Sequence, residues 1–170
     1  ANLYEDIVAL APNEFNRIYL ASAYQNAGRY AEAEKVLRDL EQESPFSGDI
    51  QVRLAGLKLA QNDVESALGY FEKGIYLKDN KMMNTTKYRM ALTQTYRENK
   101  RWQEAWDQIS YLLTAKPKNA AVQMLLGNFY SQRNQSEEAV KAFKNALQYD
   151  PTEVSAYSAI SQQLAMQAAL

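Results

Sequence analysis

The sequence predicts an all-α fold, a right-handed α-solenoid of stacked helix-turn-helix hairpins. Apolar residues recur at helical spacing in one stretch after another, which is typical of amphipathic helices. Glycine, asparagine or proline separates many of these stretches, where a helix is expected to end. The pattern also repeats along the chain. Because one hairpin cannot bury its apolar face alone, consecutive hairpins of such a repeat must stack.

The repeat has a period of 34 residues with one longer step. Ala33, Ala67, Ala105 and Ala139 stand near the starts of amphipathic stretches, at separations of 34, 38 and 34 residues. Tyrosines precede three of these alanines by nine residues, and prolines follow three of them by twelve. These phased residues are Tyr24, Tyr96, Tyr130, Pro45, Pro117 and Pro151. Four units in one phase indicate a repeat array rather than a chance motif.

The fourth unit, residues 120–153, contains LLGNFY followed by SEEAVKAFKNALQYDP. Its marked positions are Leu126, Gly127, Tyr130, Ala139, Phe143, Ala146 and Pro151. This pattern closely resembles the signature of the tetratricopeptide repeat family. The second unit departs from it, because Lys58 stands in place of the aromatic residue and Asp79 in place of the proline. The resemblance covers nearly the whole chain.

The resemblance implies a division of the chain into repeats and partial repeats. The expected parts are a second helix of a preceding repeat at 1–13, full repeats at 14–47, 48–81, 86–119 and 120–153, an inserted turn at 82–85, and a half-repeat or capping helix at 154–170. The insertion either lengthens the connection or presents Met82 and Met83 to a partner. The chain begins at Ala1 rather than Met, which fits a piece of a longer scaffold.

The turns inside the hairpins carry their own signals. Gly28, Asn62 and Asn134 are expected in the left-handed conformation that ends a helix. Asp63 and Ser136 are the expected N-caps of the helices that follow.

Composition argues against several classes of function. The 170 residues include 19 basic and 20 acidic ones, so a basic surface for nucleic acid is not expected. Cysteine and histidine are absent, which excludes thiol nucleophiles, imidazole acid–base chemistry and Cys/His metal sites. No phosphate loop or nucleophile elbow is visible. We predict that the protein is not an enzyme and has no catalytic residue, cofactor or metal.

No apolar run approaches the ~20 residues that cross a bilayer, so direct membrane insertion is not expected. A soluble protein of the cytoplasm or of the bacterial periplasm fits the sequence equally well.

Proteins of the tetratricopeptide repeat family bind extended peptides on the concave face that the first helices of the hairpins line. The resemblance therefore implies a groove for a protein or peptide partner. The expected lining residues are Phe15, Ile18, Tyr19, Ser22, Gln25, Asn26, Asp49, Val52, Arg53, Lys87, Met90, Gln94, Arg97, Met124, Asn128, Ser131 and Tyr157. Amide side chains in this set could bond a peptide backbone, and the apolar ones could receive side chains.

One subclass of the family clamps the C-terminal carboxylate of a chaperone with lysine, asparagine and arginine side chains. The matching positions here are Ile18, Ser22, Arg53, Lys87 and Ala91, and only Lys87 agrees. A chaperone-tail function is therefore not expected. Arg53, Lys87 and Arg97 could attract an acidic segment or could be ordinary solvated charges.

The sequence thus predicts a protein-interaction scaffold, as part of a larger bacterial assembly or secretion protein. Two alternatives remain open. The chain could associate with itself through apolar faces at its ends, where Ile7, Leu10, Ile160 and Leu164 lie. It could also be an accessory repeat domain of a larger enzyme.

Overall fold

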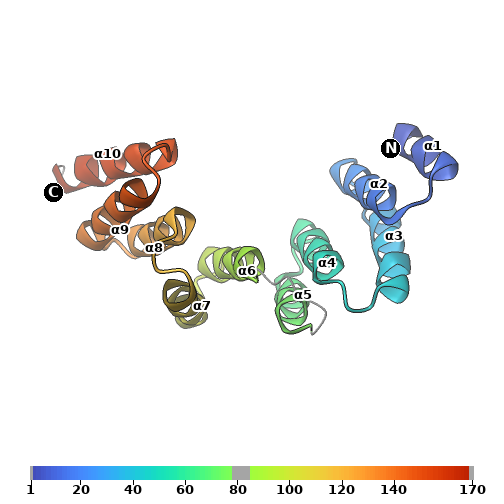
Figure 1. Ribbon diagram of the computed structural model, residues 1–170, viewed down its shortest axis with the longest axis horizontal. Helices are drawn as coiled ribbons and strands as arrows, with labels where there is room; N and C mark the ends of the chain where they lie inside the picture. The colour runs from blue at the N-terminus through green and yellow to red at the C-terminus, as the bar shows by residue number, and fades with distance from the viewer. Residues whose placement is uncertain (1, 78–84, 169–170) are drawn as a thin grey trace. The chain divides into compact units, whose positions relative to one another are not determined.

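The computed structural model describes residues 2–77 and 85–168, and every regular element in these ranges is an α-helix (Figure 1). The helices of this part of the chain are α1 (Asn2–Leu10), α2 (Glu14–Asn26), α3 (Tyr30–Glu43), α4 (Gly48–Ala60), α5 (Val64–Tyr76), α6 (Thr86–Glu98), α7 (Trp102–Ala115), α8 (Ala120–Gln132), α9 (Ser136–Tyr149) and α10 (Val154–Ala168). The predicted all-α fold class is confirmed.

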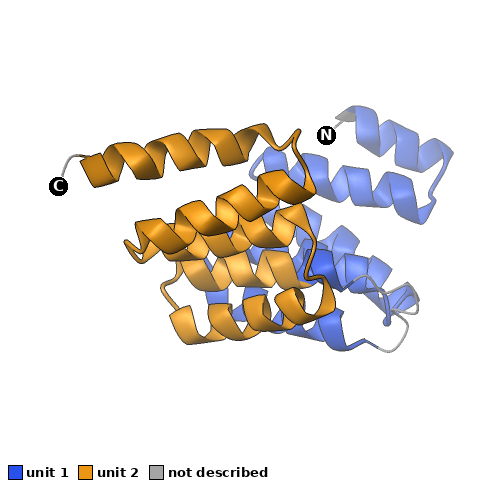
Figure 2. Cartoon of the chain, turned by 60° about the vertical axis from the view of Figure 1, so that its left-hand side comes forward, with its two compact units in different colours: residues 1–88 blue, residues 89–170 orange. Residues whose placement is uncertain are grey.

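The chain forms two compact units, residues 1–88 and 89–170, which Figure 2 shows in two colours. In unit 1, α2 packs against α3 and α4 packs against α5, and α1 covers α2. In unit 2, α8 packs against α9, and α10 covers α9. Each unit is therefore a stack of helices that follow one another in the sequence.

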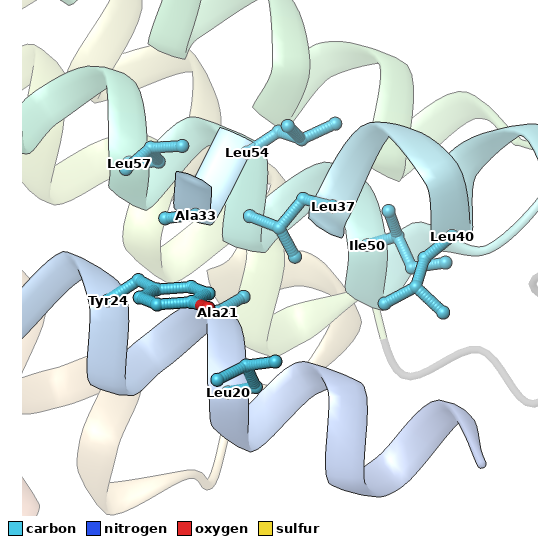
Figure 3. Packing of buried hydrophobic residues seen from close by; sticks show 9 residues of the cluster. All are labelled: Leu20, Ala21, Tyr24, Ala33, Leu37, Leu40, Ile50, Leu54 and Leu57. Carbon is cyan, nitrogen blue, oxygen red and sulfur yellow. The ribbon is translucent and has the colours of Figure 1, made fainter. Parts of the chain in front are cut away.

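The core of unit 1 lies between α2, α3 and α4. Figure 3 shows its side chains converging from these helices. The buried members are Leu20, Ala21, Tyr24, Ala33, Leu37, Leu40, Ile50, Leu54 and Leu57. Ala21 and Ala33 are small residues at helix contacts, as the repeat pattern predicts, because a larger side chain there would separate the helices.

The C-terminal half of unit 2 has a second core. Ala139, Phe143 and Ala146 of α9 are buried with Ala156 of α10. Gly127 of α8 lies directly against this core. A Cβ atom at Gly127 would stand 2.3 Å from the ring of Phe143, so only glycine allows the two helices this approach.

The turns inside the hairpins adopt the left-handed conformation. Gly28, Asn62 and Asn134 have φ angles of 73°, 60° and 59°, which confirms the prediction for these three positions. Lys100, the corresponding residue of the third hairpin, also has a positive φ of 58°. Lysine has no special preference for this region, so sequence alone did not suggest it.

The two predicted N-caps have different outcomes. The side chain of Asp63 accepts a hydrogen bond from the Ser66 backbone N–H at 3.2 Å, as predicted. The prediction for Ser136 is wrong, because Ser136 is already the first helical residue. Gln135 occupies the cap position, and its side chain makes no capping hydrogen bond.

The boundaries assigned to the repeats stay predictions. The inserted turn expected at 82–85, with Met82 and Met83, lies outside the described residues apart from Thr85.

Candidate functional site

The first helices of the hairpins in unit 1, α2 and α4, carry most of the predicted groove residues of that unit. Helix α2 starts at a good cap, because the Asn13 side chain accepts a hydrogen bond from the Asn16 backbone N–H at 2.8 Å. Further along α2, Ser22 and Gln25 lie on the side that shares a pocket with Arg53 and Gly56 of α4. They line a pocket of about 200 Å³, whose other walls are Ala21, Leu37, Arg53 and Gly56.

A second pocket, of about 310 Å³, lies between α4 and the first turn of α6 within unit 1. Asp49, Val52, Arg53, Lys87 and Tyr88 line it. Lys87 Nζ is 2.6 Å from Asp49 Oδ1. The hydrogen bond from Lys87 lowers the pKa of Asp49, and the same contact raises the pKa of Lys87. These two charges therefore compensate each other, while Arg53 lines both pockets.

The predicted aromatic anchors of α2 form a separate patch. Phe15 and Tyr19 are 65% and 46% exposed, and their rings meet edge to face at a centroid distance of 4.7 Å. Tyr4 of α1 stacks on Tyr19 at 6.3 Å. Phe15 and Tyr19 were predicted from the sequence but Tyr4 was not, because α1 was expected to belong to a preceding repeat.

Most of the predicted groove residues of unit 2 gather around one pocket. Met90, Gln94 and Arg97 of α6 line it together with Met124 and Asn128 of α8. Its volume is about 360 Å³, and its other walls are Glu98, Ala121, Leu125, Glu153 and Ser155. The pocket thus combines apolar methionine side chains with amide groups, in the mixture that an extended peptide can use.

Arg97 is the half-buried cation of this pocket. Its Nε donates a hydrogen bond to Gln132 Oε1 at 2.9 Å. Burial lowers the pKa of Arg97, while Glu98 acts in the opposite direction. Glu98 accepts a hydrogen bond from Gln94 at 2.8 Å. Arg97 therefore lies among polar partners of its own chain rather than free at the surface.

Besides Phe15 and Tyr19, four further predicted groove residues lie outside the linings of these three pockets. Ile18 packs against the core of unit 1, and Asn26 is exposed at the end of α2. Ser131 accepts a hydrogen bond from Gln163 of α10 at 2.8 Å. Tyr157 is exposed on α10.

A fourth pocket lies away from the predicted groove, between α7 and α8 of unit 2. Trp102, Trp106, Phe129 and Tyr130 form most of its wall, with Gln103, Arg133 and Gln135 at its edges. The Trp106 and Phe129 rings are 5.6 Å apart, and Trp106 stays 36% exposed. The two tryptophans pack between neighbouring hairpins, and Tyr130 is half-buried.

Within residues 2–77 and 85–168, no cluster of three or more acidic side chains could hold a metal ion. In the same part of the chain, no helix is long and apolar enough to cross a membrane.

The sequence profile of the tetratricopeptide repeat matches residues 26–95 and 96–164. The chain belongs to the tetratricopeptide repeat family. This confirms the resemblance and the solenoid fold class. Tetratricopeptide repeats are protein–protein interaction scaffolds and are typically non-catalytic, and this chain is a scaffold of that general kind. A comparison with curated protein sequences found no match.

Several solved structures resemble this tetratricopeptide repeat chain. A thermophilic repeat protein of Thermus thermophilus is 14% identical, with a TM-score of 0.76 over 96% of this chain and 88% of that one. YrrB, described as a repeat protein with an unusual peptide-binding site, is 19% identical, with a TM-score of 0.64 over 92% and 79%. The APC/C hetero-tetramer Cut9-Hcn1 is 17% identical, with a TM-score of 0.69. The match covers 88% of this chain but only 29% of that one. At these identities the likeness shows the fold alone.

Proposed function

We propose that the chain holds an extended segment of a partner protein on the first helices of its hairpins. The observation that carries this proposal is the pocket between α6 and α8. Two methionines, Met90 and Met124, stand there beside the amides Gln94 and Asn128. Methionine adapts to different side chains, and an amide can both donate to and accept from a peptide backbone.

Unit 1 supports the same proposal with different chemistry. Its pockets contain the hydroxyl and amide of Ser22 and Gln25, the apolar Val52 and the charged Arg53. The pocket of about 200 Å³ is smaller than the about 300–1,000 Å³ that a small-molecule ligand usually needs, and the pocket of about 310 Å³ lies at the lower end of that range. We therefore propose a peptide segment rather than a metabolite as the ligand. The bacterial assembly setting stays a prediction.

The test is a displayed library of random peptides selected on the full chain. Ser22→Arg and Asn128→Arg add bulk and charge within the pockets of unit 1 and unit 2, and at least one of them should lower the affinity of each selected peptide at least tenfold. Gln42→Arg and Gln148→Arg, on exposed positions of the second helices α3 and α9, are the matched controls and should bind normally. Circular dichroism checks that all four variants stay helical.

Two results would contradict the proposal. One is that selection yields no binding peptide. The other is that selected peptides bind Ser22→Arg and Asn128→Arg as tightly as the unchanged chain.

Self-association is a second candidate, because the end helices carry exposed apolar side chains. Leu10 of α1 is 88% exposed and Leu164 of α10 is 50% exposed. Solenoid ends need a cap, which a second copy could supply. Light scattering over a wide concentration range should then show dimers that Leu10→Asp or Leu164→Asp abolishes. A monomer at every concentration would contradict this candidate and leave peptide binding unaffected.

A further inference from the structure

We propose that the pocket beside Arg53 receives an acidic side chain of the bound segment, and that the backbone of this segment crosses α4 over Gly56. This inference rests on the proposed function and specifies its partner: a segment with an aspartate or glutamate that meets unit 1.

Arg53 brings a positive charge to this face of unit 1 that no ion pair compensates among the described residues. Lys87 is paired with Asp49 at 2.6 Å, so the two contribute no net charge to this face of unit 1. Lys58, on the same helix as Arg53, is likewise paired with Glu34 at 2.8 Å. Among the described residues, Arg53 donates no hydrogen bond and forms no salt bridge, although its charge helps to lower the pKa of Asp49. Within residues 2–77 and 85–168, two cations thus face the carboxylate of Asp49, which leaves one uncompensated positive charge beside the two pockets.

Arg53 also has the right position for an anion. It stands in the wall of both pockets, exposed at the surface of α4, with the amide of Gln25 across the smaller one. A guanidinium group can hold a carboxylate through two parallel hydrogen bonds, and such charge-assisted bonds are stronger than those between neutral groups. The pocket of about 200 Å³ is several times the ~30 Å³ of one water molecule, which suits one side chain.

Gly56 supports a close approach of the ligand backbone to α4, independently of the charge of Arg53. It lies inside α4, where glycine destabilises a helix relative to alanine. Packing explains Gly74, where a Cβ atom would meet Gln51 and Gly48 at 3.3 Å, but it does not explain Gly56, where a Cβ atom would meet nothing within 4 Å. A bare stretch of helix beside a pocket allows the backbone of a ligand to approach closely.

The first experiment reads the charge preference of Arg53. The displayed random library is selected in parallel on the unchanged chain, on Arg53→Gln and on Arg53→Glu. We expect the unchanged chain to enrich peptides with aspartate or glutamate at one position, Arg53→Gln to lose this enrichment, and Arg53→Glu to enrich lysine or arginine there instead. An acidic peptide should bind Arg53→Gln about tenfold more weakly than it binds the unchanged chain.

The second experiment compares two glycine variants. Gly69 of α5 resembles Gly56, since a Cβ atom there would also meet nothing within 4 Å, but it lies outside the pocket linings described above. Gly56→Ala and Gly69→Ala should both keep or raise thermal stability, because alanine favours the helix. Only Gly56→Ala should weaken the selected acidic peptide, by about tenfold.

The outcomes separate the two levels of the proposal. Peptides whose binding depends on Ser22 or on Asn128 but that show no acidic preference would overturn the Arg53 inference and keep the proposed function. An acidic preference that Arg53→Glu does not reverse, or equal binding by Gly56→Ala and Gly69→Ala, would also overturn the inference. A failure of the library to yield any binder would contradict both.

Discussion

The junctions between hairpins use different chemistry in the two units, although they stand at the same positions of the repeat. In unit 1, Glu34 of α3 and Lys58 of α4 form a salt bridge of 2.8 Å across 24 residues. In unit 2 the corresponding residues of α7 and α8 are Trp106 and Tyr130, whose ring centroids are 6.3 Å apart. Equivalent positions of the repeat can therefore hold an ion pair in one unit and an aromatic pair in the other.

The residues around each pair differ in the same way: they are charged or polar in unit 1 and aromatic in unit 2. In unit 1, the carboxylate of Glu41 on α3 accepts hydrogen bonds from Lys73 at 2.7 Å, Arg38 at 2.9 Å and the buried Gln51 at 3.0 Å. In unit 2, Trp102 and Trp106 both pack on Phe129. We infer that unit 1 depends more on charge, and therefore on pH, while unit 2 depends more on buried area.

The largest expected effect comes from moving the unit 1 pair into unit 2. The double variant Trp106→Glu with Tyr130→Lys should lower the free energy of unfolding by about 3 kcal/mol. A partly exposed ion pair contributes only about 0–1 kcal/mol, whereas the lost rings bury large apolar surfaces. Urea unfolding measures the loss, and Trp106→Phe, which keeps a ring, should cost only about 1 kcal/mol. An unchanged unfolding midpoint in the double variant would show that the rings contribute nothing.

An acid titration tests the charged junction of unit 1. Burial would raise the pKa of Glu41, but its hydrogen bonds from Lys73, Gln51 and Arg38 lower it to about 2, from 4.5. Because the folded pKa is lowered, this stabilisation is complete above about pH 4.5 and is lost as the pH falls towards 2. Glu41→Gln should therefore cost about 2 kcal/mol at pH 7 and flatten the loss of stability below pH 4.5.

Glu43 offers a matched control for Glu41. Its side chain is 60% exposed and forms a salt bridge with Arg17 at 2.7 Å. Glu43→Gln should cost less than about 0.5 kcal/mol, since exposed ion pairs are screened by solvent. Equal losses for Glu41→Gln and Glu43→Gln would argue against a special role of the Glu41 network.

The smallest expected effects concern the left-handed turn residue of each hairpin. In unit 1, Gly28 has a φ of 73°, so Gly28→Ala should destabilise by about 1 kcal/mol. In unit 2, Lys100 has a φ of 58°, so Lys100→Gly should instead stabilise by about 0.5 kcal/mol. Thermal unfolding of both variants checks the opposite signs, and a shift of the same sign in both would contradict the strain argument.

Much of the fold could be predicted from the sequence, because the repeat shows each signal several times. The helix pattern and the left-handed turns at Gly28, Asn62 and Asn134 follow from local preferences that hold in any context. The prediction of Ser136 as an N-cap is wrong because serine is favoured both at a cap and in the first helical turn, and the sequence does not decide between adjacent positions.

The candidate site could be predicted only in part. The period of the repeat identified the first helices, and the structure brings Met90, Gln94 and Asn128 to one pocket. The sequence could not predict which charged side chains of the groove form ion pairs. Lys87 pairs with Asp49 across 38 residues, so it is compensated, while Arg53 is not. Such pairings depend on how neighbouring helices approach each other.

The sequence by itself therefore determined the family, the helices and the phase of the repeat, because these depend on spacing along one chain. Only the tertiary structure decided which side chains meet across a helix contact. It placed a salt bridge between Glu34 and Lys58 and rings at the equivalent Trp106 and Tyr130. It also placed Gly56, where a Cβ atom would meet nothing within 4 Å, in the same pocket wall as Arg53. Contacts of this kind depend on distances between helices, which the local sequence does not encode.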